Sequence, residues 1–542
     1  MSIRSVLSNI DAHLERMTGP DADSDLSRQT FRAGVILILV VSAALRFWNL
    51  SGGSIGMDEG ATRAWARLPL NIILFHNIDV HPPLTYAVQH LWHRVFPDLE
   101  MMRGPAALAG IASIGLAIYV VRDFASRRAA LITGALLAVS TAHVYYSQDA
   151  RMYPFLMCGL MIAFYGALRI TESKWRMAAY VLGAAIAIYS HAIGLIAMAM
   201  IGGAGLVGGF ILKGRQVVLP WFGVNLIVLA IALPWLISLY SASQAFTGLG
   251  DAVKLSEIQW FYRNAIGAPG LFNFSPLIEG SLLVLAAIGT AFAFAQKKYP
   301  FALALTGLWL IYPIILGLYH LHEPVLSTRV MIPSLLGIMM AVGYGLSRIK
   351  HHWRLGAMGV LLAAFVSSTV VELNNRFKFD QNREATQFAV DRGMGDAPHI
   401  SCNIYSMAAL WEARPDIRLY NYGFGDAPLT TSMPLTHYKN PSYWMLLRHG
   451  AWGHQKLTPE ETTNELGDGW IIDGGLLELL AQEDQAVVIE SYCQTRFVEK
   501  IEQALLESSF ELVETKRYSE ESGKTPVFIH PQTIVRLYKR RS

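Results

Sequence analysis

The sequence has little charge and little cysteine. Only 16% of its 542 residues are Asp, Glu, Lys or Arg, whereas 53% are hydrophobic, and it contains three cysteines. This composition excludes an ordinary soluble protein of this length, whose surface would need more charge. It predicts a polytopic α-helical membrane protein.

The few charges are unevenly distributed. The chain before Glu372 holds 17 acidic and 26 basic residues, whereas the chain from Glu372 onward holds 24 acidic and 18 basic ones. The formal net charge of +3 therefore hides a basic first part and an acidic tail. No soluble face gathers basic residues with interleaved aromatics, so we expect no nucleic-acid partner.

Two kinds of ligand-binding motif are also missing. The sequence has no phosphate-cradling Gly-rich motif of the nucleotide type, which disfavours a soluble nucleotide sugar as donor. The small residues at 202–205 fall in an apolar run, where they permit close helix packing. His191, His320, His322 and Glu323 lack established metal-site spacing. We expect no required cofactor, with a divalent metal as the alternative.

The sequence contains roughly eleven apolar runs suited to crossing a bilayer. No small-residue cleavage site follows the first, so we interpret it as a signal anchor after a cytoplasmic segment, 1–32. The runs predict a transmembrane domain over 33–371. They are 33–50, 104–121, 129–146, 154–170, 177–190, 192–212, 217–240, 277–295, 301–319, 330–346 and 355–371.

The short loops indicate the orientation in the cell inner or plasma membrane. Basic residues cluster at 122–128, 174–176, 213–215, 297–298 and 348–354. The positive-inside rule places these loops in the cytoplasm. The alternating loops and the tail then lie on the extracytoplasmic face.

An acidic pair, Asp58 and Glu59, follows the first apolar run in the first outer loop. Two adjacent carboxylates at a membrane exit need water, a cationic partner or a catalytic role, because burying them is costly. The alternative is a solvated loop without function.

The rest of that loop, 51–103, has helical spacing of apolar residues at 61–75 and 84–96. This spacing predicts two amphipathic helices in the membrane interface. Between them, two prolines after His81 predict a rigid corner. The corner is either a neutral turn or a holder that directs His81 toward a site.

Further polar residues fall at the predicted outer ends of later runs. Asp149 and Arg151 precede Tyr153, while His191 and Arg329 end two other short polar stretches. Each has an ordinary alternative, such as a snorkelling arginine, an aromatic belt or a hydrogen-bonded structural histidine.

The order of these stretches resembles a known superfamily. It includes Arg46 near the end of the first run, Asp58-Glu59, His81-Pro82-Pro83-Leu84, Ser147 to Tyr153, Tyr189-Ser190-His191 and Ser327-Thr328-Arg329. Together they resemble polyprenyl-phosphate-sugar-dependent glycosyltransferases of the GT-C superfamily, in the branch of protein O-mannosyltransferases and lipid A aminoarabinose transferases. The resemblance covers about residues 33–348. Several relatives carry lysine where this chain has His81.

The resemblance implies an inverting transfer of a hexose or pentose from a polyprenyl phosphate to a hydroxyl acceptor at the extracytoplasmic face. The acceptor would belong to a glycolipid, a polysaccharide or a protein of the cell envelope. Asp58 would take the proton of the attacking hydroxyl. Glu59 would orient Asp58 or hold the acceptor.

The leaving phosphate needs positive charge more than it needs a general acid. The resemblance assigns this role to Arg151 and Arg329, with His81 or Arg46 as further candidates. Asp149, Tyr153 and His191 are the remaining candidates for substrate binding.

From Glu372 the composition is that of a soluble domain, 372–542, with no catalytic constellation. Short strands at 399–405, 418–422, 470–473, 486–491 and 533–538 and an amphipathic helix at 496–508 predict a small α/β domain. Its two cysteines, Cys402 and Cys493, either pair or remain free.

Two other functions compete with glycosyl transfer. A transporter or flippase of a lipid-linked or small anionic substrate would favour charges at mid-membrane and broken spans in matching halves. Here the charges fall at the outer ends and no repeat is apparent. A non-catalytic scaffold would leave the acidic pair unexplained.

Overall fold

The computed structural model divides into two compact units. The helical unit comprises Met1–Trp48, Ala106–Ile237 and Thr247–Glu372, and the loop-and-tail unit comprises Asn49–Pro105, Ser238–Phe246 and Leu373–Ser542. The structure describes residues 26–75, 79, 81–245, 255–268, 275–321, 327–375, 381–402, 406, 409–410, 413–414, 416–421, 435–437, 471–473, 476–491, 495–518 and 533–541.

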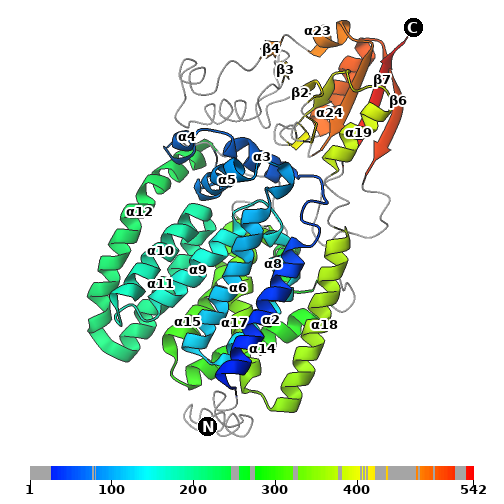
Figure 1. Ribbon diagram of the computed structural model, residues 1–542. Helices are drawn as coiled ribbons and strands as arrows, with labels where there is room; N and C mark the ends of the chain where they lie inside the picture. Colours follow the sequence, from blue (N-terminus) through cyan, green and yellow to red (C-terminus); the bar gives the residue numbers. More distant parts are fainter. Residues whose placement is uncertain are drawn as a thin grey trace. The chain divides into compact units, whose positions relative to one another are not determined.

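The described part of the helical unit is built mostly from helices that coincide with the expected apolar runs (Figure 1). Neighbours such as α9, α10 and α11 run side by side. The main elements are α2 (Arg28–Phe47), α6 (Gly104–Phe124), α7 (Arg127–Val139), α8 (Thr141–Ser147), α9 (Tyr153–Ala167), α10 (Lys174–Ser190), α11 (Ile193–Lys213), η2 (Gly214–Val217), α12 (Val218–Ala245), α13 (Leu255–Ile266), α14 (Ser275–Ala295), α15 (Tyr299–Thr306), η4 (Gly307–Ile311), α16 (Tyr312–His320), η5 (Thr328–Met331), α17 (Ile332–Arg348) and α18 (His351–Asn375).

Among the described residues, seven helices are long and apolar enough to cross a membrane, or eight if the bent pair α7 and α8 forms one span. Here α11 and α12 count as one stretch, Ile193–Tyr240, and the shorter Tyr153–Ala167 is set apart. The chain is therefore a multi-pass membrane protein. The expected number of spans, eleven, stays a prediction.

The expected span over 129–146 is bent, because α7 and α8 meet at an angle of 63°. Ser140, at φ −63° and ψ 124°, leaves the helical region between them. The last carbonyls of α7 then lack helical donors. Arg46 supplies them, with Nη1 donating to Ala138 O at 3.1 Å and Nη2 to Leu137 O at 3.3 Å.

Helices α9 and α10 pack closely because glycines face the contact. A Cβ on Gly159 would lie 2.6 Å from Ala187 N, and one on Gly183 would lie 2.2 Å from Ala163 N. Small residues at membrane helix contacts let the two backbones approach in this way. Gly205, in the 202–205 run, has the same role, because its Cβ would lie 2.5 Å from Ala167 O.

The first outer loop contains α3 (Met57–Ala66), α4 (Leu70–Phe75), α5 (Leu84–Val95) and η1 (Leu99–Met101). A single helix over 61–75 is not formed, since α3 and α4 are separate. Pro69, just before α4, disfavours helical backbone at the residue preceding it. The apolar faces of these helices meet around Trp65, Ile73 and Tyr86, each fully buried.

Within the loop-and-tail unit, hydrogen bonds connect the first outer loop to the tail. The Asn382 side chain donates from Nδ2 to Ile55 O at 3.0 Å, and the Arg383 amide donates to Ser54 Oγ at 3.0 Å. A Cβ on Gly60 would lie 2.6 Å from Ala409 N, so α3 approaches this backbone closely. The donors of these two hydrogen bonds, Asn382 and Arg383, both belong to α19 (Asn382–Asp391).

The tail forms a mixed sheet of seven strands in the order β4-β3-β2-β1-β5-β7-β6. Strand β1 pairs in parallel with β2 and β5, and the other pairs are antiparallel. The strands are β1 (His399–Ser401), β2 (Leu419–Asn421), β3 (Leu435–His437), β4 (Ile471–Asp473), β5 (Gln485–Glu490), β6 (Phe510–Arg517) and β7 (Ile534–Arg540).

Helices cover both faces of this sheet. Alternate residues of β5 point to opposite sides. Val487 packs with Ala385 of α19, whereas Val488 packs with Leu480 of α23 (Leu476–Ala481) and Ile501 of α24 (Thr495–Glu507). The expected fold class, a helical membrane body with a small C-terminal α/β domain, is confirmed.

Five of the strands and α24 coincide with the expected segments, although β1 ends at Ser401 and not at 405. Strands β3 and β6 were not expected. Cys402 is disulfide-bonded and Cys158 is free. Cys493, the other tail cysteine, lies outside the described residues.

Candidate functional site

Asp58 and Glu59 lie in the first turn of α3 and not in an irregular loop. Gly56 caps this helix, and its amide donates to Glu59 Oε2 at 3.2 Å. Asp58 is half-buried, and its carbonyl accepts from Thr62 Oγ1 at 2.9 Å. The positive end of the helix dipole stabilises negative charge at this position.

Glu59 forms a buried bidentate ion pair with Arg103. Arg103 donates from Nε to Oε1 at 2.7 Å and from Nη2 to Oε2 at 2.6 Å, and each side chain is only 6% exposed. The same guanidinium donates to Leu50 O and Ser54 O, each at 3.0 Å. The ion pair therefore fixes the stretch of chain that leads into α3, just before Asp58. Sequence reasoning missed Arg103, although it ends the first outer loop just before the next apolar run.

His81 is held by an acidic residue that sequence reasoning also missed. Its Nδ1 lies 3.1 Å from Asp79 Oδ2, and the Tyr86 hydroxyl donates to the same oxygen. Asp79 and Tyr86 are buried, while the His81 side chain is 23% exposed. The corner therefore orients the imidazole. An acidic residue two positions before the histidine was the available signal.

In the helical unit, candidate residues gather around Tyr146 at the end of α8. The Tyr146 ring lies 5.0 Å from that of Tyr153, and Tyr153 lies 5.8 Å from the imidazole of His191. Asp149 and Arg329 both interact electrostatically with the Tyr146 hydroxyl. The structure thus brings together four expected residues, Asp149, Tyr153, His191 and Arg329, around one tyrosine. We call these five residues the tyrosine cluster.

The two expected phosphate-binding arginines of this unit are fixed by short structural elements. Arg329 lies in η5, where the Tyr312 hydroxyl donates to the carbonyl of the next residue, Val330, at 2.7 Å. Arg151 is buried, and its amide donates to Asp149 O at 2.7 Å. Both arginines are therefore anchored through the backbone of their segment.

The histidines of this unit have structural contacts. His191 Nδ1 accepts from the Ile193 amide at 3.1 Å, which caps the start of α11, and the His320 ring contacts Phe261. No group of three or more His, Cys, Asp or Glu that could hold a metal ion occurs among the described residues. His322 and Glu323 lie outside them.

Arg46 is fully buried, and its guanidinium forms hydrogen bonds at the break between α7 and α8. Besides the two carbonyls at the end of α7, it donates to Ser42 O at 3.1 Å and lies 2.8 Å from Nδ1 of His143. These contacts hold Arg46 within the helix packing, and its expected role at the phosphate stays a prediction. Asp58, Glu59 and His81 belong to the other unit.

Comparison with solved structures decides the fold. ArnT from Cupriavidus metallidurans in the apo state superimposes with a TM-score of 0.54 and 13% identity, covering 94% of this chain and 97% of that one. The same protein bound to undecaprenyl phosphate gives a TM-score of 0.53 and 14% identity with the same coverage. This chain has a GT-C glycosyltransferase fold. ArnT is thus matched over nearly its whole length.

A third structure, the apo oligosaccharyltransferase of Archaeoglobus fulgidus, matches with a TM-score of 0.45 and 11% identity, covering 73% of this chain and 65% of that one. No protein-family model matches the sequence, and no curated protein matches it.

Proposed function

We propose that this protein is a membrane glycosyltransferase. It transfers a sugar, with inversion, from a polyprenyl-phosphate-linked donor to a hydroxyl acceptor at the extracytoplasmic face of the inner or plasma membrane. The GT-C fold supports the reaction class, and a protein of this fold, ArnT, has been solved bound to undecaprenyl phosphate.

The observation that carries the proposal is the difference between two neighbouring carboxylates. Both oxygens of Glu59 are engaged by Arg103 in a buried pair, whereas Asp58, one residue earlier, is half-buried on the first turn of α3. An inverting transfer needs one base for the acceptor hydroxyl. We assign that role to Asp58 and a positioning role to Glu59.

Each step of this reaction conserves charge and protons. The acceptor oxygen attacks the anomeric carbon while its proton passes to Asp58, and the bond from that carbon to the donor phosphate oxygen breaks. The phosphate leaves as an anion that needs neutralisation more than protonation. Arg151 and Arg329 supply the positive charge, and Asp149, Tyr153 and His191 contact the substrate. His81, oriented by Asp79, is a further donor to the phosphate.

The experiment that tests the proposal uses the purified full chain in detergent or nanodiscs with a panel of polyprenyl-phosphate-linked pentoses and hexoses. Formation of a new glycoside with loss of donor would support a transferase. A transporter or flippase would move the donor between leaflets and leave every glycosidic bond intact. Chelator added to a parallel reaction tests whether a divalent metal is needed.

A further inference from the structure

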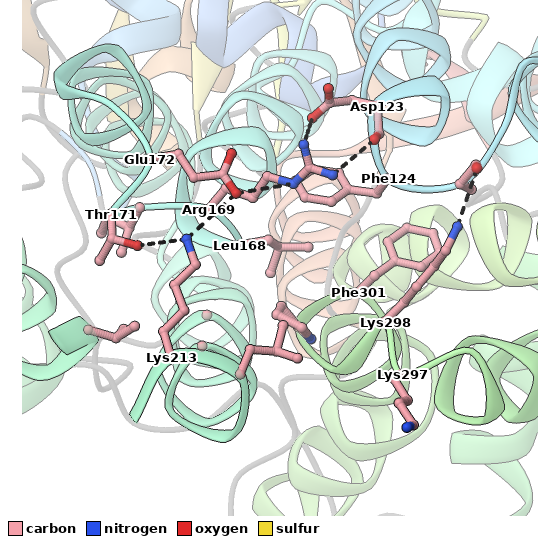
Figure 2. A pocket seen from close by; sticks show the side chains of 17 residues that line it. Asp123, Phe124, Leu168, Arg169, Thr171, Glu172, Lys213, Lys297, Lys298 and Phe301 are labelled. Carbon is pink, nitrogen blue, oxygen red and sulfur yellow. Dashed lines mark hydrogen bonds and ion pairs between the residues drawn. The ribbon is translucent and has the colours of Figure 1, made fainter. Parts of the chain in front are cut away.

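A second feature of the helical unit is a cavity of about 320 Å³, shown in Figure 2. It is formed where α6 and α11 end and α15 begins. Helices α9 and α11 start near Tyr153 and His191, so the cavity lies at the opposite ends of these helices from the tyrosine cluster. It is therefore separate from the candidate site of that unit.

The floor of the cavity is apolar. Leu168, Val217 and Phe301 line it and are at most 5% exposed. Leu212, which also lines it, is 52% exposed on the outside of α11. In a membrane protein such an apolar surface contacts lipid tails, so the cavity adjoins the lipid-facing surface.

The mouth of the cavity is charged, with four basic and two acidic side chains. The Arg169 guanidinium lies between the two carboxylates, with Nη1 at 3.6 Å from Asp123 and Nε at 3.8 Å from Glu172 (Figure 2). Lys213 Nζ lies 3.7 Å from the same glutamate and 3.1 Å from Thr171 Oγ1. Both acidic side chains, Asp123 and Glu172, are thus already paired with basic side chains of the protein.

Two adjacent lysines complete the lining. Lys298 Nζ donates to Ala125 O at 3.3 Å. The side chain of Lys297 forms no hydrogen bond or ion pair with any described residue, and Figure 2 draws none. The mouth therefore carries a net positive charge, and an anion placed there would gain contacts that the protein does not supply. Basic pockets between membrane helices suit lipid head groups.

We propose that this cavity binds the phosphate head group of an anionic membrane phospholipid, with its tails along the exposed side of α11. The charge of the mouth matches the phosphate, and the apolar floor and Leu212 match the glycerol and acyl region. This site is independent of glycosyl transfer. It would fix the protein to lipids of the leaflet that faces the basic loops.

The test is lipid binding by the purified full chain, measured by native mass spectrometry with added phosphatidylglycerol or phosphatidylcholine. The double variant Lys213→Gln with Lys297→Gln removes two cations of the mouth. The matched control, Lys174→Gln with Arg215→Gln, removes two exposed cations of the same helix ends that do not line the cavity. Thermal unfolding confirms that both variants are folded.

We expect the unmodified chain to retain phosphatidylglycerol in preference to phosphatidylcholine. The cavity variant should bind phosphatidylglycerol about tenfold to thirtyfold more weakly, since each cation near a lipid head group contributes on the order of a factor of five. The control should stay within about twofold. If both variants lost the same affinity for phosphatidylglycerol, the loss would come from the general surface charge, and the proposal would be overturned. Displacement of the lipid by excess inorganic phosphate would overturn it too, because the site would then be one for the free anion.

Discussion

Arg103 donates to both carboxylate oxygens of Glu59, at 2.7 and 2.6 Å, across 44 positions of the chain. Its remaining donors reach the carbonyls of Leu50 and Ser54, so one side chain closes the turn that leads into α3. Asp58 lies between this turn and Glu59. The proposed base is thus positioned by a pair that does not itself need to react.

The first prediction concerns the base. Asp58→Asn keeps the shape of the side chain but removes the proton acceptor, so turnover should fall by roughly two to four orders of magnitude. Donor binding and thermal stability should change little. Transfer assays with a polyprenyl-phosphate-linked sugar measure the loss. Near-normal turnover would exclude this role, and Asp149→Asn would then be the next variant to assay.

The second prediction separates Glu59 from its neighbour. Glu59→Gln leaves the Arg103 guanidinium buried without its counter-charge, which should lower the free energy of unfolding by about 3 kcal/mol. The double variant Glu59→Gln with Arg103→Gln should recover part of that loss. Chemical unfolding in detergent measures both. A Glu59→Gln protein as stable as the parent would contradict the structural role of the pair.

The third prediction concerns the phosphate. Arg151→Gln and Arg329→Gln should each weaken donor binding, by about tenfold or more, because a charge-assisted bond to phosphate is lost. Binding of a polyprenyl phosphate to the purified chain measures the effect without requiring turnover. Arg128→Gln, at the start of α7, is the control for a lost arginine. Unchanged affinity in both variants would remove these residues from the phosphate site.

The fourth prediction concerns the orientation. Ser51 and Gln216 are exposed, and they belong to segments that the positive-inside rule places on opposite faces. In intact cells Ser51→Cys should react with an impermeant thiol reagent, whereas Gln216→Cys should react only after the membrane is opened. The parent chain gives the background of the native cysteines. The reverse pattern would place the proposed site in the cytoplasm.

The fifth prediction is a pH dependence of the tail. Burial lowers the pKa of His399, in β1, to about 4. A histidine in the unfolded chain has a pKa near 6.5. Between that pH and about 4, the unfolded chain therefore binds a proton at His399 that the folded domain does not bind. Stability should therefore fall as the pH drops from about 6.5 to 4, by about 3 kcal/mol in total.

Hydrogen exchange of the β1 and β5 amides, corrected for intrinsic rates, measures this loss. The His399 Nδ1 lies 2.8 Å from Ala397 O, a contact that an asparagine side chain can reproduce. His399→Asn should therefore flatten the pH dependence while keeping the fold. A parent domain equally stable at both ends of the window would contradict the prediction.

Much of the fold could be predicted from local patterns in the sequence. The apolar runs predicted where the membrane helices lie, because whether a segment can lie in lipid depends mainly on its own length and hydrophobicity. The break at Ser140 was not predictable from the run 129–146, since short polar residues such as Ser140 and Thr141 also occur inside continuous membrane helices. Strand β6 was missed because most of its residues are polar, and β3 because it is only three residues long.

The candidate site was harder to predict from the sequence. The acidic pair was visible in the sequence, but the difference between Asp58 and Glu59 depends on Arg103, which lies 44 residues away. The same holds for the tyrosine cluster, where Tyr146 and Arg329 come from distant segments. Contacts across such separations are set by tertiary packing, which a single sequence does not reveal.

The buried guanidinium of Arg46 also bears on how the protein is made. Its partners in α7 follow it by more than ninety positions, so when α2 leaves the ribosome those carbonyls have not yet been synthesised. A lone arginine in a lipid environment is costly. The first span should therefore stay in a protected, partly hydrated setting until α7 joins it, which makes docking of these two helices an early checkpoint in membrane assembly.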